Sequence, residues 1–169
     1  MKCRHCGTPL EKTFVDLGAS PPSNAYLTRE ALGRPEVWYP LRVLVCTNCW
    51  LVQTDDHAGR EELFAHDYAY FSSTSSGWLA HSHAYVDAMI ERFGLSAESL
   101  VVEVAANDGY LLQYVKAAGV PCYGVEPTAS TAAAAREKGI EIVERFFGVE
   151  LASELADAGK QADLTAANN

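Results

Sequence analysis

From about residue 99 to the end of the chain, apolar runs and helical segments follow one another in alternation. Four short apolar runs predict strands at about 100–104, 121–126, 140–143 and 162–166. The segments between them have helical spacing and end at a glycine, which predicts helices at about 109–118, 129–138 and 149–158. Strands that alternate with helices are typical of an α/β domain with a parallel sheet and right-handed crossovers.

A longer amphipathic helix is predicted before this domain. Apolar residues recur at helical spacing from Trp78 to Phe93 and form one face. Ser75 or Ser76 can cap the start of the helix, and Gly94 is a typical end. We expect this helix to pack against the sheet that follows it.

Two cysteine pairs, Cys3-x-x-Cys6 and Cys46-x-x-Cys49, stand near the N-terminus. Two residues between cysteines let both thiolates reach one ion from a single tight turn. Two such turns complete a tetrahedral shell of four sulfurs, which indicates structural zinc. The alternatives are four unrelated thiols or two disulfides. Cys122 lies in a predicted strand and is expected to be a small core residue.

The segment between the two pairs contains strand-like pieces at 13–17 and 41–45 and a turn-rich connection at 18–24. So small a lobe needs a metal to hold its fold together. Because a shell of four cysteines has no open position, we do not expect this zinc to take part in the chemistry.

The turn after the first strand of the α/β domain carries the candidate chemistry. Glu103 interrupts the apolar strand near its carboxyl end, where open α/β sheets bind their ligands. Residues 105–109 follow as Ala-Ala-Asn-Asp-Gly. Asn107 or Asp108 can cap the next helix through a side-chain oxygen. Gly109 permits a close backbone approach or a positive φ.

This turn differs from the G-x-G-x-x-G turn that lets a backbone close on a dinucleotide's pyrophosphate. It keeps one glycine, and Asp108 at a helix N-terminus would repel a pyrophosphate. S-adenosylmethionine has no phosphate and carries a sulfonium and an ammonium, so it is the better electrostatic match. Glu126, at the end of the second strand, is placed to accept hydrogen bonds from both ribose hydroxyls, while Glu103 and Asp108 can face the methionine end. The alternative is that Glu103 and Glu126 merely end their strands.

Three aromatic residues and a run of hydroxyl side chains fill residues 67–75, which read Asp-Tyr-Ala-Tyr-Phe-Ser-Ser-Thr-Ser. One interpretation is an aromatic packing strip between domains, followed by a capped helix start. The other places the tyrosine hydroxyls over a cofactor or substrate cleft, since such clefts often lie between domains.

The net charge of the chain indicates which kinds of binding partner are unfavourable. A formal net charge of −9 and the lack of a basic stripe argue against nucleic acid and anionic membranes. The N-terminus lacks the apolar core of a signal peptide, and no run approaches the length of a membrane span. We therefore expect a cytoplasmic location.

The motifs, in their order along the chain, resemble the N-terminal part of the zinc-containing deoxysugar C-methyltransferases. The resemblance covers essentially all of the chain. It is carried by the two cysteine pairs and by the segments at 16–25, 68–73, 103–112, 124–127 and 168–169.

The resemblance implies S-adenosylmethionine-dependent methylation, by way of an enolate, at C3 of a dTDP-linked 4-keto-deoxysugar in bacterial antibiotic-sugar pathways. It also implies an α/β fold with a zinc-binding lobe followed by a Rossmann-like class I methyltransferase domain, here truncated after the fourth strand. The expected parts are a zinc lobe at 1–60, an aromatic bridge and linking helix at 61–98, and the first part of the cofactor domain at 99–169.

With the resemblance added, the metal ligands are expected to be the four paired cysteines. Tyr70 is expected at the junction of cofactor and sugar as a catalytic residue, with the catalytic base beyond residue 169. The expected cofactor-binding residues are Tyr68, Ser72, Ser73, Glu103, Ala105, Asn107, Asp108, Gly109, Tyr110, Leu111, Glu126, Pro127 and Asn168.

Two other functions stay open at this point. The same cofactor could serve an O- or N-methyltransferase acting on another small molecule. Alternatively, a zinc-ribbon interaction module could be joined to a non-catalytic Rossmann scaffold. The sequence does not fix the oligomeric state, and a monomer like others in the family is compatible with it.

Overall fold

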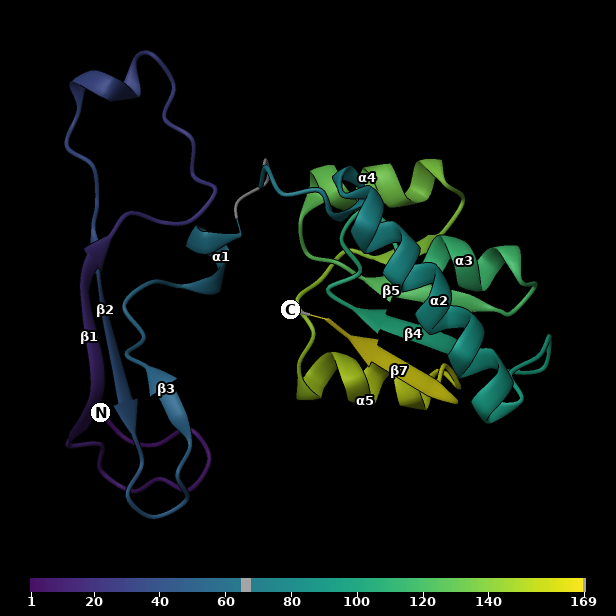
Figure 1. The fold of residues 1–169 in the computed structure, drawn as a ribbon, viewed down its shortest axis with the longest axis horizontal. Helices are drawn as coiled ribbons and strands as arrows, with labels where there is room; N and C mark the ends of the chain where they lie inside the picture. Colours follow the sequence, from purple (N-terminus) through teal and green to yellow (C-terminus); the bar gives the residue numbers. More distant parts are fainter. Residues whose placement is uncertain (65–67, 169) are drawn as a thin grey trace. The chain divides into compact units, whose positions relative to one another are not determined.

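The computed structural model describes residues 1–64 and 68–168 and divides the chain into two compact units, Met1–Leu63 and Phe64–Asn169 (Figure 1). Asp67 in the aromatic segment and Asn169 at the end of the last motif lie outside the described residues.

The first unit is built on an antiparallel sheet of three strands in the order β1-β2-β3. Its elements are β1 (Lys12–Ser20), the 3-10 turn η1 (Ala31–Gly33), β2 (Tyr39–Val45), β3 (Val52–Thr54) and the short helix α1 (Arg60–Leu63). The strands predicted at 13–17 and 41–45 are confirmed, and both are longer than predicted. The three residues of β3 are too few to show a strand pattern, so the sequence did not predict it.

The buried core of this unit is small and consists largely of the metal-binding region. Cys3, Leu10, Leu44 and Cys46 are its buried residues, with Cys49 packed against them. All but one residue of β1 are exposed to solvent. The sulfur atoms thus occupy the place that a hydrophobic core would hold in a larger domain.

The second unit is an α/β layer structure around a parallel sheet in the order β6-β5-β4-β7 (Figure 1). The α/β fold and the parallel sheet predicted from the sequence are both confirmed. The elements are η2 (Ser72–Thr74), α2 (Ser76–Phe93), β4 (Val101–Val104), α3 (Leu112–Ala117), β5 (Cys122–Val125), α4 (Ala129–Glu137), β6 (Glu141–Val143), α5 (Val149–Asp157) and β7 (Leu164–Ala167).

The two faces of this sheet have separate cores. Val101 packs with Val86 of α2, Val115 of α3 and residues of α4. On the other face, Val102 packs with Leu151 of α5. Since side chains alternate along a strand, Glu103 lies on the same face as Val101. Cys122 of β5 is half-buried against this first core, as expected.

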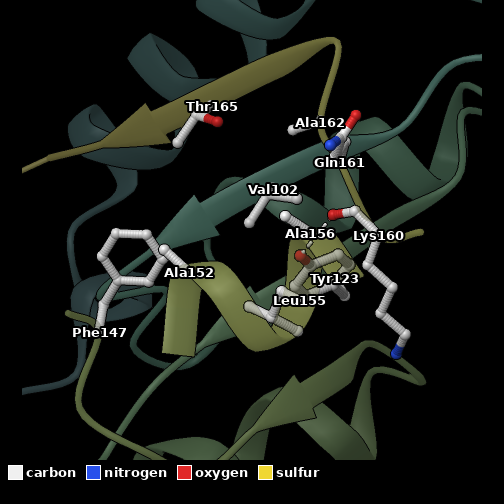
Figure 2. Close-up of a pocket in the computed structure, with 10 residues that line it drawn as sticks. All are labelled: Val102, Tyr123, Phe147, Ala152, Leu155, Ala156, Lys160, Gln161, Ala162 and Thr165. Atoms are coloured by element: carbon white, nitrogen blue, oxygen red, sulfur yellow. Dashed lines mark hydrogen bonds between the residues drawn. The ribbon is translucent and has the colours of Figure 1, made fainter. Parts of the chain in front are cut away.

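A groove of about 190 Å³ lies on the α5 face of the sheet (Figure 2). Val102 of β4, Thr165 of β7 and Leu155 of α5 are among the residues that line it. Tyr123 also lines the groove and donates a hydrogen bond to the backbone oxygen of Lys160 at 3.0 Å. This groove is on the opposite face from Glu103, so it is not part of the site predicted from the sequence.

Helix α2 has the termini that the sequence predicts. Ser75 Oγ accepts a hydrogen bond from Trp78 N at 3.2 Å, and Gly94 adopts φ 62° while its N–H bonds to Ile90 O. The helix is the longest of the described part of the chain. Neither it nor any other described helix is long and apolar enough to cross a membrane.

One local prediction was wrong. Helix α3 begins at Leu112, not at 109, and neither Asn107 nor Asp108 caps it. Leu111 occupies the cap position without a side-chain hydrogen bond. The oxygens of Asn107 and Asp108 instead accept hydrogen bonds from the backbone of η2, which competes successfully for them.

Two glycines let the turn after β4 lie tightly against the sheet. Gly109 has φ 73°, and a Cβ there would collide with Ile140 Cδ1. A Cβ on Gly124 of β5 would lie only 2.5 Å from Ala106 Cβ. The close backbone approach predicted for Gly109 is therefore confirmed.

Candidate metal centre and cofactor site

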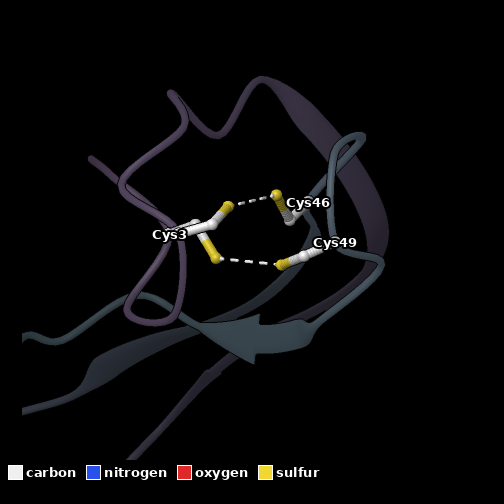
Figure 3. Close-up of side chains that lie close together, drawn as sticks. Cys3, Cys46 and Cys49 are labelled. Carbon is white, nitrogen blue, oxygen red and sulfur yellow. Dashed lines mark hydrogen bonds between the residues drawn. The ribbon is translucent and has the colours of Figure 1, made fainter.

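The four paired cysteines converge in the first unit. Their sulfur atoms all lie within 4.8 Å of one another. Cys3 and Cys49 Sγ are 3.6 Å apart, and Cys6 and Cys46 Sγ are 3.5 Å apart (Figure 3). Zinc–sulfur bonds of about 2.3 Å in a tetrahedron require sulfurs about 3.8 Å apart. A disulfide would bring them to about 2 Å, so the separations fit a zinc centre and not two disulfides.

Each cysteine pair is held in a tight turn by one backbone hydrogen bond. Gly7 N donates to Cys3 O, and Trp50 N donates to Cys46 O, both at 3.0 Å. The residue after each pair has a positive φ, 73° at Gly7 and 65° at Trp50. Glycine adopts this conformation freely, whereas tryptophan does so at a cost of roughly 1–2 kcal/mol. The turns at Cys3–Cys6 and Cys46–Cys49 thus have the same backbone geometry despite different sequences.

Gln53 on β3 supports the metal centre and was not predicted from the sequence. Its Nε2 donates to Cys3 Sγ at 3.3 Å, and its Oε1 accepts from Arg4 N at 3.0 Å. The side chain is buried. Contacts of this kind orient metal ligands. Because 50 residues separate Gln53 from Cys3, no local pattern could have revealed the contact.

The electrostatics of the four thiols call for a cation. Hydrogen bonds from Thr8 and then Asn48 lower the pKa of Cys6 to about 5. A backbone hydrogen bond from Leu51 lowers the pKa of Cys49, but burial and the other three thiols outweigh it and raise that pKa to about 12. Four thiolates this close therefore need a bound metal ion to be ionised together.

Replacing Gln53 with leucine is expected to weaken zinc binding by about 10- to 100-fold, the usual effect of losing a partner that orients a ligand. Competition with a chromogenic chelator measures the change. Gln113→Leu is the matched control, since Gln113 bonds to Tyr110 O in the second unit. Equal zinc affinity in the Gln53 variant and the control would show that Gln53 does not support the centre.

The second candidate site lies at the carboxyl edge of the parallel sheet, where the turn after β4 meets the segment before η2. Asn107 joins the two. Its Oδ1 accepts from Ser72 N at 2.9 Å, and its Nδ2 donates to Tyr70 O at 3.0 Å. Asn107 has φ 50° and Ala105 has φ 57°, so the turn is held in a conformation that favours glycine. The structure thus brings together two segments that the sequence analysis treated as separate motifs.

Asp108 is held by one oxygen only. Its Oδ2 accepts from Ser73 N at 3.2 Å and lies 3.5 Å from Lys138 Nζ. Its Oδ1 is buried and has no hydrogen-bond partner. Lys138, which the sequence analysis did not single out, therefore belongs to this site.

Glu103 is fully buried, and neither of its carboxylate oxygens has a hydrogen-bond partner. Burial is the main cause that raises the pKa of Glu103 from 4.5 to about 8. Tyr110 and Asn168 are near enough to oppose this rise, while the charges of Asp108 and Glu126 add to it. The three carboxylates therefore share one electrostatic environment.

Glu126 follows β5 directly and is buried, and two backbone N–H groups donate hydrogen bonds to its carboxylate. Asn107 N donates to its Oε2 and Thr128 N donates to its Oε1, both at 2.9 Å. Each carboxylate oxygen keeps a second lone pair, so acceptance from ribose hydroxyls stays possible. Thr128 Oγ1 is also buried without a partner, and the sequence analysis did not identify this residue.

The remaining predicted site residues differ in their placement. Tyr110 is buried, and its hydroxyl accepts from Asn168 Nδ2 at 3.0 Å. Leu111 has its side chain in the apolar core, so it offers only backbone to a ligand. Tyr70 is 52 % exposed, and Tyr68 packs its ring against Phe64.

The donor set tests which ligand the site fits. Among the described residues, the buried side-chain oxygens that lack a partner all lie at this edge: both oxygens of Glu103, Asp108 Oδ1 and Thr128 Oγ1. These are acceptors, apart from the Thr128 hydroxyl and the proton that Glu103 carries below its raised pKa of about 8. They fit a ligand that brings cationic or hydroxyl donors, and they do not fit a pyrophosphate. The residues present thus fit S-adenosylmethionine.

Comparisons with known proteins indicate the class of protein to which this chain is similar. Residues 3–64 match a family model of a zinc binding domain that is named for methyltransferases. Over 155 residues the chain is 33% identical to the C-methyltransferase NovU of Streptomyces niveus, and the match covers 92% of this chain and 37% of NovU. The chain thus spans little more than a third of the length of the curated relative. Over most of its length the chain is thus similar to part of a C-methyltransferase, and its first unit carries this zinc-binding domain.

Proposed function

We propose that this protein is an S-adenosylmethionine-dependent C-methyltransferase that acts at C3 of a nucleotide-linked 4-keto-deoxysugar. The observation that carries the cofactor is the set of buried, unpartnered acceptor oxygens at the carboxyl edge of the sheet. The reaction type is supported by the identity with NovU, whose name is C-methyltransferase. The sugar acceptor, with its dTDP carrier, rests on the resemblance of the motifs.

Three groups of residues would hold the cofactor. Glu126 would accept hydrogen bonds from the ribose, Glu103 and Asp108 would face the cationic methionine end, and Ser72 and Ser73 would bind its carboxylate. When bound, S-adenosylmethionine supplies a methyl group activated by a sulfonium. The aromatic ring of Trp78 of α2 lies 5.8 Å from that of Tyr110 and would help to exclude water from the bound cofactor.

Tyr70 is proposed to act at the methyl acceptor. Asn107 fixes its backbone through Tyr70 O, and its half-exposed side chain stays free to meet a substrate. A proton next to a ketone can be removed by a positioned base, and a donor near the carbonyl oxygen stabilises the enolate that forms. The Tyr70 hydroxyl would be such a donor. The zinc centre, closed by four sulfurs, would stabilise the fold of its lobe.

Replacing Glu126 with alanine is expected to weaken S-adenosylmethionine binding by about 1–3 kcal/mol, the cost of losing a charged hydrogen-bond partner. Isothermal titration calorimetry measures it. Glu141→Ala is the control, because Glu141 of β6 forms an ion pair with Lys160 and lies outside the proposed cofactor site. Unchanged affinity in the Glu126 variant would remove its proposed role at the ribose.

The function itself is tested by incubating the product of the complete gene with radiolabelled S-adenosylmethionine and a panel of nucleotide-linked 4-keto sugars. Label on a sugar carbon is the expected result. Label on oxygen or nitrogen of another small molecule would replace the proposal with an O- or N-methyltransferase. A protein that binds no S-adenosylmethionine at all would favour an interaction module on a non-catalytic scaffold.

A further inference from the structure

Lys138 joins three segments of the second unit that are far apart in the sequence. It follows the last residue of α4, and its Nζ donates to Ser73 Oγ at 2.8 Å and to Asp108 O at 2.5 Å. The same Nζ lies 3.5 Å from Asp108 Oδ2. One ammonium group thus holds the end of α4, the turn after β4 and the η2 segment together.

The backbone of Lys138, at the end of α4, is itself held in place. Lys116 of α3 donates to Lys138 O at 3.1 Å and to Gly139 O at 2.7 Å. These bonds satisfy carbonyl groups at the end of α4. Lys116 therefore holds the same helix end as Lys138, yet none of its hydrogen bonds reaches Asp108.

The contacts of Lys138 divide the Asp108 carboxylate into two unlike oxygens. Oδ2 is engaged by Ser73 N and by the charge of Lys138, while Oδ1 has no partner although the residue is only 3 % exposed. A buried carboxylate oxygen without a partner is costly unless a donor reaches it. The arrangement keeps an acceptor ready for a donor that the described chain does not provide.

We propose that Lys138 is a positioning residue that fixes Asp108 and the Ser73 turn so that Asp108 Oδ1 receives the ammonium group of the cofactor's amino-acid end. This inference rests on the proposed function. It assigns Lys138 no contact with the ligand. Recognition of the amino-acid end depends on Lys138, whereas recognition of the adenosine end, on the β5 side at Glu126, does not.

Two ligands separate these ends. S-adenosylhomocysteine carries the amino-acid group, and 5′-methylthioadenosine lacks it. In the zinc-loaded 169-residue chain, Lys138→Met is expected to weaken S-adenosylhomocysteine binding by about tenfold or more, since a charged hydrogen bond is misplaced. Its affinity for 5′-methylthioadenosine should stay within about twofold, because no adenosine contact changes. Calorimetry measures both.

Two further variants complete the experiment. Lys160→Met removes a lysine of the same unit whose Nζ pairs with Glu141, away from Asp108 and Ser73, and should leave both affinities unchanged. Lys138→Arg keeps a positive charge and donors, and it should bind S-adenosylhomocysteine more tightly than Lys138→Met does.

Several results would overturn the inference. Equal loss of both ligands in Lys138→Met would mean that the lysine only stabilises the fold. Tighter binding of S-adenosylhomocysteine would mean that the freed negative charge of Asp108 matters more than its position. An arginine variant no better than the methionine variant would also contradict the inference. A wild-type chain that binds neither ligand would instead remove the proposed function, and the inference with it.

Discussion

Replacing Cys46 with serine is expected to abolish zinc binding and to unfold the Met1–Leu63 unit. Cys46 is fully buried in the small core of that unit, and the other buried residues there are Cys3, Leu10 and Leu44. Binding of a structural zinc contributes about 10–16 kcal/mol in small zinc domains, as much as the whole stability of many proteins. No apolar core of comparable size replaces it in this unit.

Native mass spectrometry should find one zinc per wild-type chain and none in Cys46→Ser. Hydrogen exchange should show lost protection in β1 and β2, with protection retained in β4 and β5. Cys122→Ser is the control, since Cys122 is a half-buried cysteine of β5 outside the cluster. A Cys46 variant that keeps its protection in β1 without metal would show that the lobe folds without zinc.

The second unit is expected to lose stability as the pH rises from about 5 to about 8. Burial raises the pKa of Glu103 to about 8 in the folded chain, from 4.5. Between these values the folded state holds a proton that the unfolded state has released. Stability is therefore fully present below pH 4.5 and falls by about 1.4 kcal/mol for each pH unit up to 8, roughly 5 kcal/mol in all.

Glu103→Gln should remove this dependence, because glutamine has the same shape and does not titrate. The variant is expected to be more stable than the wild type at pH 8 and similar to it at pH 5. Hydrogen exchange in β4 and β5 between pH 6 and 8 measures the difference without removing zinc. Glu91→Gln, at an exposed position of α2, is the control. Parallel pH curves for wild type and Glu103→Gln would show that Glu103 is ionised in the folded chain.

The parallel sheet was predictable because each of its strands is a local apolar run next to a helix that ends at glycine. The two cysteine turns were also predictable from a local pattern, because each places two metal ligands within four residues. β3 was not predictable, because a strand of three residues with Gln53 at its centre has no pattern. This segment is a strand because it pairs with β2, which is a contact between distant parts of the chain.

Contacts between distant segments set the limit of prediction at the cofactor site. Asn107 and Asp108 have the composition of helix caps, and a local rule assigns them to the helix that follows. Backbone N–H groups 35 residues earlier bind these side chains instead. Lys138 was missed for a similar reason, since a lysine at a helix end gives no sign in the sequence of a partner 30 residues away. The kinds of residue in the site were visible in the sequence, but their pairing was not.

The tight packing at Gly109 and Gly124 restricts how this protein can diversify during evolution. A side chain at either position would displace Ile140 or Ala106, so a change there requires compensating changes in the core behind it. Tyr70, by contrast, is half exposed and can be exchanged with little effect on packing. Selection for a different methyl acceptor is therefore expected to change residues in the segment that carries Tyr70. The turn after β4 is expected to stay constant.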